Sequence, residues 1–304
     1  MNEYGSSMSS TQSSFVHQRD VTDDIFGYTL TALFILGVCG NLLGVIVLTK
    51  LQKTQGGVRL LKFLGIVDII LLFLLFENQI LTLFPEQPRT MVVILGGVNT
   101  FTFPLGLTCY TFEIYLTVLI AGQRAVAVSR PLQSAVYVRK SVINICILVI
   151  FIFSIVLNIP YWLIYKLELF FDQELNMTWI TSNYSNFVSS TFNHIFDKYV
   201  ILVLRALVPL VALIVCNILI VRSARTTINT EIRRKKSDHL APINIAIGTM
   251  SIVTHITTAA ERALNIEISQ ITSLLLIINC STNFIFYCAF GRIFQKTLKD
   301  LFKK

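Results

Sequence analysis

The chain consists mainly of long apolar runs separated by short polar segments. Seven runs are long enough to cross about 30 Å of hydrocarbon as helices that rise about 1.5 Å per residue. They span residues 26–50, 60–84, 91–122, 141–165, 199–221, 241–262 and 266–290. Threonines dilute the sixth run, but no charged residue interrupts it between Asp238 and Glu261. The pattern predicts an all-α membrane protein, a bundle of seven transmembrane helices.

The charges of the connecting segments alternate between the two sides of this predicted bundle. Lysines and arginines cluster after the first, third and fifth runs and in the tail, and cytoplasmic loops carry such an excess. The other side holds the acidic residues Asp20, Asp23, Asp24, Glu86, Glu168, Asp172 and Glu174. We therefore expect a multi-pass plasma-membrane protein with its amino terminus outside and its carboxyl terminus in the cytoplasm.

A short amphipathic segment follows the last apolar run. It reads GRIFQKTLKDLFKK, with apolar residues at helical spacing opposite lysines, which is typical of a helix lying on the inner membrane surface. We expect three parts: an extracellular amino-terminal segment over 1–25, the seven-helix domain over 26–290, and a cytoplasmic amphipathic eighth helix with its tail over 291–304.

Two glycosylation sequons agree with the predicted orientation. Asn176-Met-Thr and Asn183-Tyr-Ser both lie after the fourth run, in a segment that the charges place outside. Only such a segment meets the glycosylation machinery. The sequence predicts glycans on Asn176 and Asn183, although chance occurrence of these common tripeptides is an alternative.

The composition excludes several other classes of protein. Hydrophobic residues make up 54% of the chain and charged residues 14%, so a water-soluble domain of this length is not expected. The six cysteines lie in or beside apolar runs without a CxxC pair, so we expect neither a disulfide nor a metal centre. No nucleophile–base pair or phosphate-binding glycine loop indicates an enzyme. The basic clusters suit orientation and anionic lipid, and we expect no nucleic-acid partner.

Several short motifs stand in order on the predicted helices. They are Gly40-Asn41, Leu64-Gly-Ile-Val-Asp68, Gln123-Arg124-Ala125, Pro160, Pro209 and Asn279-Cys-Ser-Thr-Asn283-Phe-Ile-Phe-Tyr287-Cys. Together they make the chain from about Gly40 to Leu298 resemble the rhodopsin-like (class A) G-protein-coupled receptors. The segment after Asn283, with Asn217 where most relatives have tyrosine, is similar to the invertebrate FMRFamide-like neuropeptide receptors. The resemblance implies a receptor for an extracellular peptide or small molecule, coupled to a heterotrimeric G protein.

The chain also departs from the family's pattern. Gln123 replaces the aspartate that usually precedes Arg124. The family's outer disulfide cannot form, because no cysteine lies at the outer end of the third run or after the fourth. His255-Ile-Thr257 replaces a tryptophan–proline element, and Phe284 replaces a proline. Helices without these prolines bend less, so the usual switch between resting and active states is in doubt.

Three ionisable residues stand out within the apolar runs. Asp68, Glu113 and Arg205 each need a partner or a water-filled cavity, since a charge at this depth costs about 2.5–3.5 kcal/mol. The resemblance places Glu113 beside Asp68, with the helix-seven residues Asn279 and Asn283 nearby. The two acids then either hold a sodium ion or share a proton. One carboxyl kept protonated as a buried hydrogen-bond donor is the alternative.

The resemblance also places a ligand cavity at the outer half of the bundle. An arginine one turn outside Pro209 suits a carboxylate or phosphate; the alternatives are an internal pair with an acid such as Glu113, or outward snorkelling. Glycine at 106, where amine receptors carry an aspartate, argues against a monoamine ligand. The candidate ligand-binding residues are Gln79, Gly106, Tyr110, Arg205, His255, Glu261 and Arg262, for which core or solvated-rim roles are the alternatives.

At the inner face, the resemblance assigns coupling and switching to Gln123, Arg124, Asn217 and Tyr287. Two rival functions remain open. A transporter or channel would use Asp68, Glu113 and Arg205 as an ion path, although the inverted repeat and broken helices of such proteins are missing from the sequence. A receptor-like decoy would bind ligand without signalling, because the switch elements are altered.

Overall fold

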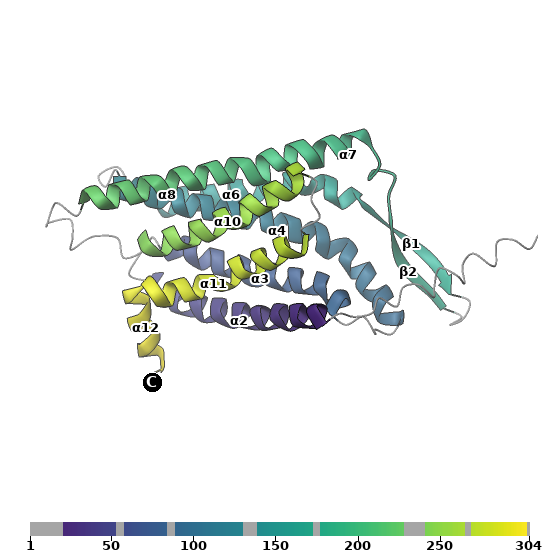
Figure 1. Ribbon diagram of the computed structural model, residues 1–304, viewed down its shortest axis with the longest axis horizontal. Helices are drawn as coiled ribbons and strands as arrows, with labels where there is room; N and C mark the ends of the chain where they lie inside the picture. The colour runs from purple at the N-terminus through teal and green to yellow at the C-terminus, as the bar shows by residue number, and fades with distance from the viewer. Residues whose placement is uncertain are drawn as a thin grey trace, which may run out of the picture.

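The computed structural model describes residues 21–52, 58–83, 89–129, 139–172, 177–227, 241–264 and 269–302. Within these ranges seven long helices lie side by side along the long axis of the molecule (Figure 1). They are α2 (Val21–Gln52), α3 (Arg59–Leu83), α4 (Arg89–Ser129), α6 (Lys140–Asn158), α8 (Val208–Thr227), α10 (Ala241–Leu264) and α11 (Ser269–Phe290). The predicted seven-helix bundle is confirmed.

Six stretches of the described chain are long and apolar enough to cross a membrane. They are Ile25–Leu51, Ile94–Ser129, Ser141–Leu163, Thr191–Ser223, Pro242–Glu261 and Ile271–Phe290. The remaining long helix, α3, packs against α2, α4 and α11. Its residue Asp68 is fully buried. Because neighbouring helices bury Asp68, α3 can carry an acid that a lipid-facing position would not tolerate.

The fourth and fifth spans change their helical type where prolines interrupt them. After α6 the chain continues as a 3₁₀-helix, η2 (Ile159–Leu163), with Pro160 in its first turn, where its missing N–H is tolerated. The fifth span begins with α7 (Thr191–Ile195) and continues through two π-helical stretches, η3 (Phe196–Val200) and η4 (Leu202–Leu207), into α8. Pro209 has no N–H to give to the carbonyl of Arg205. The second π-helical stretch ends at Leu207, two residues before this proline.

A β-hairpin, which the sequence analysis did not predict, lies between the fourth and fifth spans. Strands β1 (Tyr165–Asp172) and β2 (Met177–Tyr184) pair antiparallel, with Tyr165 opposite Tyr184. Residues of β1 alternate in character, with Leu167 and Leu169 on one face and Lys166 and Glu168 on the other, as expected for a strand. Figure 1 shows the hairpin at the end of the bundle opposite α12 (Arg292–Phe302).

Glycines on α2 allow this helix to approach α11 closely. A Cβ atom at Gly37 would collide with the Ser281 hydroxyl, and one at Gly40 would lie 3.1 Å from Phe284. Ser281 also donates a hydrogen bond of 3.1 Å to the Leu33 carbonyl. Small residues permit such close helix pairs in membranes, where packing rather than the hydrophobic effect holds helices together.

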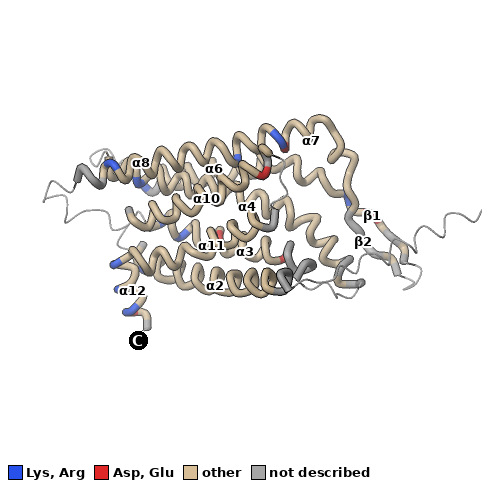
Figure 2. Tube along the Cα trace, viewed as in Figure 1, with Lys and Arg blue, Asp and Glu red and all other residues tan. Residues whose placement is uncertain are grey.

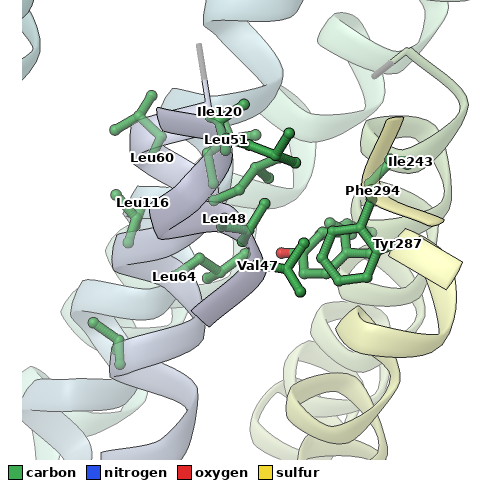
Figure 3. Packing of buried hydrophobic residues seen from close by; sticks show 14 of the residues in the cluster. Val47, Leu48, Leu51, Leu60, Leu64, Leu116, Ile120, Ile243, Tyr287 and Phe294 are labelled. Carbon is green, nitrogen blue, oxygen red and sulfur yellow. The ribbon is translucent and has the colours of Figure 1, made fainter. Parts of the chain in front are cut away.

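The core at the α12 end joins the first helices to the last (Figure 3). Val47 and Leu48 of α2 belong to the same buried cluster as Tyr287 of α11 and Phe294 of α12. The chain turns sharply at Gly291, where a Cβ atom would lie 2.5 Å from the Tyr287 carbonyl. The predicted amphipathic helix is therefore present as α12, and it is anchored to the bundle by Phe294. Figure 2 shows basic residues concentrated at this end of the bundle.

Candidate functional site

Two acidic residues, Asp68 of α3 and Glu113 of α4, are buried side by side, and both accept a hydrogen bond from the same helix, α11. The Asn283 amide of α11 donates a hydrogen bond of 2.6 Å to Asp68 Oδ2, and the Asn279 amide donates one of 3.3 Å to Glu113 Oε1. The two asparagines are four residues apart and so lie one helical turn from each other. The structure thus brings together the four residues that the resemblance had grouped.

Further polar residues extend this cluster. The hydroxyl of Thr117 donates to Glu113 Oε1, and that of Ser251 donates to Asn279 Oδ1. Neither Thr117 nor Ser251 was predicted from the sequence, although a hydroxyl within an apolar run was an available signal. In the described part of the chain, Asp68 Oδ1 and Glu113 Oε2 are buried without a hydrogen-bond partner. Two buried carboxylates are costly, and their free oxygens fit either a sodium ion or a shared proton.

A second polar group lies around Tyr110 of α4 and His255 of α10. The Tyr110 hydroxyl lies 3.4 Å from the Thr258 hydroxyl, and its ring centroid lies 6.4 Å from that of His255. His255 is 1% exposed, and neither of its ring nitrogens has a hydrogen-bond partner among the described residues. A buried polar atom without a partner is unfavourable. His255 therefore offers unused hydrogen-bonding capacity inside the bundle.

Arg205 lies on the π-helical stretch η4 and makes its described contacts within the protein. Its Nε donates 3.1 Å to the Thr111 hydroxyl, and one terminal nitrogen donates to the Asn158 side-chain oxygen. Its guanidinium carbon lies 5.3 Å from the centre of the Tyr161 ring. At 1% exposure the side chain does not snorkel outward. Of the two internal partners, neither Thr111 nor Asn158 was singled out from the sequence.

The remaining candidate ligand residues lie nearer the hairpin end of the bundle. A Cβ atom at Gly106 would meet Leu74 of α3 at 3.8 Å, so this position faces α3. Glu261 accepts a hydrogen bond of 2.5 Å from Thr272. The side chains of Gln79 and Arg262 lie outside the described residues.

Of the two sequon asparagines, the structure describes Asn183. Asn176 lies outside the described residues. Asn183 is exposed on β2, where its amide donates a hydrogen bond of 2.5 Å to Glu168. The hairpin thus presents the second sequon on its polar face.

The four residues assigned to coupling lie toward the α12 end. Arg124 is buried, and Gln123 beside it is half-buried. Asn217 of α8 lies so close to Gly248 of α10 that a Cβ atom there would come within 2.9 Å of its amide. The Tyr287 ring lies 5.4 Å from that of Phe294, and its hydroxyl has no hydrogen-bond partner among the described residues. These side chains come from α4, α8 and α11.

Comparison with known proteins places these features in a wider group. No family model matches the chain. It is 24% identical to an FMRFamide receptor of Drosophila melanogaster, over 92% of this chain and 54% of that protein, so it spans about half the length of this relative. It is 22% identical to the probable G-protein coupled receptor frpr-1 of Caenorhabditis elegans, over 94% of this chain and 82% of that protein. The predicted resemblance is confirmed: this multi-pass membrane protein is a diverged relative of invertebrate G-protein-coupled receptors of the FMRFamide kind.

Proposed function

We propose that the protein is a plasma-membrane receptor, with its amino terminus outside the cell, that binds a neuropeptide and activates a heterotrimeric G protein. The main structural support is the polar interior of the bundle, where unsatisfied hydrogen-bonding groups lie at two levels among apolar helices. The name of the Drosophila relative specifies a peptide amide, which favours a peptide over other extracellular ligands.

The ligand would enter from the hairpin end of the bundle. His255 is the central contact in this proposal, because its two ring nitrogens are the buried polar atoms that a ligand would satisfy. Tyr110 lies beside it, and Glu261, Gln79 and Arg262 would meet the outer part of a peptide. The lack of an acidic side chain at position 106 continues to argue against a monoamine. Arg205, whose described contacts are to Thr111, Asn158 and Tyr161, is left out of the proposed peptide contacts.

The acid pair would regulate the receptor rather than bind the peptide. Asp68 and Glu113 would hold a sodium ion, together with oxygen atoms of residues at the level of Asn279 and Asn283, or the two acids would share one proton. A bound cation supplies positive charge that offsets the two buried carboxylates. The hydrogen bonds from Asn279 and Asn283 keep the carboxylates in place and tie α11 to α3 and α4.

Signalling would consist of a shift between two packings of the helices. Arg124, Gln123, Asn217 and Tyr287 line the inner side from three different helices, so a movement of these helices changes the surface offered to a G protein. The buried Tyr287 hydroxyl, which has no hydrogen-bond partner among the described residues, is available for a different contact in the other packing.

The test is ligand-stimulated nucleotide exchange. Membranes that contain the receptor and one of several heterotrimeric G proteins are screened with a library of amidated peptides, and the R124A variant serves as the control. Exchange stimulated by a peptide in the native receptor, and lost in R124A, is the expected result. Peptide binding without exchange on any G protein would support a decoy, and ion flux in vesicles without G protein would support a transporter or channel.

A further inference from the structure

A continuous series of polar contacts links the third, fourth and fifth spans near the hairpin. It begins at Asp197 of η3, which accepts a hydrogen bond from the Tyr161 hydroxyl of η2. The Tyr161 ring in turn lies under the guanidinium group of Arg205. Arg205 then donates to Thr111 of α4 and to Asn158 of α6. Asp197 and Arg205, two oppositely charged residues of the fifth span, are therefore joined through Tyr161 of the fourth span.

At the other end of this series, Thr111 and Asn158 are also hydrogen-bonded to each other. The Asn158 amide donates hydrogen bonds of 3.0 Å to the Thr111 hydroxyl and 2.7 Å to the Ser154 carbonyl. Arg205, Asn158 and Thr111 thus form a triangle in which each member contacts the other two. Such a network defines one arrangement of its three helices, because a shift of any helix leaves a buried polar atom without a partner.

The series lies within an apolar cluster, which strengthens it. Tyr161 is packed with Leu157 and Ile201, and Phe103 and Phe196 pack on the same cluster. Low polarity increases the attraction between Arg205 and its partners and raises the cost of breaking one contact. The contacts are therefore coupled, so that loss of one is expected to weaken the next.

The π-helical geometry decides which face of the fifth span carries Asp197 and Arg205. A π-helix has more residues per turn than an α-helix, so each π-helical stretch changes the direction of the side chains that precede it. The carbonyl of Leu204, in η4, accepts a hydrogen bond from the Tyr115 hydroxyl of α4. The π-helical part of the fifth span is thereby hydrogen-bonded to α4 at two neighbouring residues, Leu204 and Arg205.

The same contacts continue into the base of the hairpin. The Phe103 ring lies 6.3 Å from that of Tyr161 and 6.0 Å from that of Tyr165, and Tyr165 stacks on Tyr184 at 5.3 Å. The Ser185 N–H donates to the Ile164 carbonyl at 2.8 Å, which closes the hairpin base. All six cysteines of the chain lie in the described part, and each is a free thiol. The hairpin base is therefore held by noncovalent contacts alone.

We propose that Asp197, Tyr161 and Arg205 form a partly buried clamp that holds the outer half of the fifth span, and with it the hairpin, against the third and fourth spans. The clamp sets the position of the hairpin over the end of the bundle. It is a conformational device of this chain, separate from the proposed peptide contacts at His255 and Tyr110. Its test needs neither ligand nor G protein, so its outcome is independent of the proposed receptor function.

The experiment measures local opening in the purified full chain by amide hydrogen exchange. Y161F removes one hydroxyl but keeps the ring under Arg205, and D197N removes the charge that accepts its hydrogen bond. These mild variants are preferred to removal of Arg205, which risks misfolding. Each should speed exchange of the hairpin and of residues 191–207 by about tenfold, the factor expected for loss of one hydrogen bond to a charged group, and should leave α2 and α3 unchanged.

Matched controls come from the neighbouring residues. Tyr199 and Lys198 are exposed on the same stretch. Y199F removes a tyrosine hydroxyl, as Y161F does, and K198Q removes a charge, of opposite sign to that of Asp197, without touching the clamp. Both control variants should exchange like the native chain. The double variant Y161F/D197N should exchange no faster than the faster single variant, because both changes break one contact. Three results would overturn the clamp. They are unchanged exchange in both single variants, additive effects in the double variant, and an equal increase in exchange throughout the bundle.

Discussion

Asn283 of α11 donates a hydrogen bond of 2.6 Å to Asp68 of α3, a residue 215 positions earlier in the chain. One turn away, Asn279 makes the corresponding contact with Glu113 of α4. A single helix therefore supports both of these buried acids. This arrangement leaves one oxygen of each acid without a partner among the described residues, and it leads to a direct test of ion binding.

Sodium should stabilise the purified protein. When sodium replaces a large organic cation at equal ionic strength, the melting temperature should rise by about 2–4 °C or more, since a ligand that binds only the folded state stabilises it. D68N and E113Q should each abolish the rise. E77Q is the control, because Glu77 bonds Thr102 of α4 and does not contact the pair. A sodium effect of equal size in D68N would rule out this site, and no effect in the native chain would favour the shared proton.

Replacing His255 should separate ligand binding from stability. H255L removes two buried nitrogens without partners in the described structure, so thermal stability should stay equal or increase. Peptide potency in nucleotide exchange should fall by about tenfold or more if the ligand bonds the imidazole. T249V, on an exposed face of α10, should alter neither quantity. Full potency in H255L at normal surface level would remove His255 from the ligand site.

Glycine substitutions should distinguish close helix contact from open surface. G40V adds bulk where a Cβ atom would already lie 3.1 Å from Phe284, so it should destabilise the protein by about 1–3 kcal/mol through overpacking. The control is G122A, because a Cβ atom at Gly122 meets nothing within 4 Å. Thermal unfolding measured with a thiol-reactive dye reports both variants through the buried Cys280. Equal melting temperatures for G40V and the native chain would contradict the α2–α11 packing.

The hairpin should loosen as pH falls through the acid range. The hydrogen bond from Lys166, and then that from Asn183, holds the pKa of Glu168 below its ordinary value of 4.5. Because the pKa is lower in the folded state, the contact contributes stability above pH 4.5 and loses it as pH falls through the folded-state pKa. The effect should be small for an exposed pair. The measurement is the hydrogen-exchange protection of the β1 amides as a function of pH. E168Q should show no such pH dependence. If protection in E168Q decreases as much as in the native chain, the pH dependence comes from a group other than Glu168.

The seven spans and the amphipathic α12 followed from sequence pattern alone. Lipid cannot hydrogen-bond a backbone, so each crossing segment must be a long apolar helix, and this requirement is visible in the order of residues. The grouping of Asp68, Glu113, Asn279 and Asn283 came from the resemblance, since their spacing in sequence contains no information about which helices adjoin. The hairpin was missed, because its alternating residues were treated as part of an outer loop.

The sequence by itself determined how many helices the chain forms and which residues are too polar to face lipid, because these depend on local hydrophobicity. Only the tertiary structure decided the partners of those polar residues. Arg205 illustrates the difference: its charge was recognised in the sequence, but its contacts with Thr111 and Asn158 depend on the π-helical turn of the fifth span and on the packing of three helices. Such contacts join residues distant in sequence, and their geometry exists only after the helices have packed.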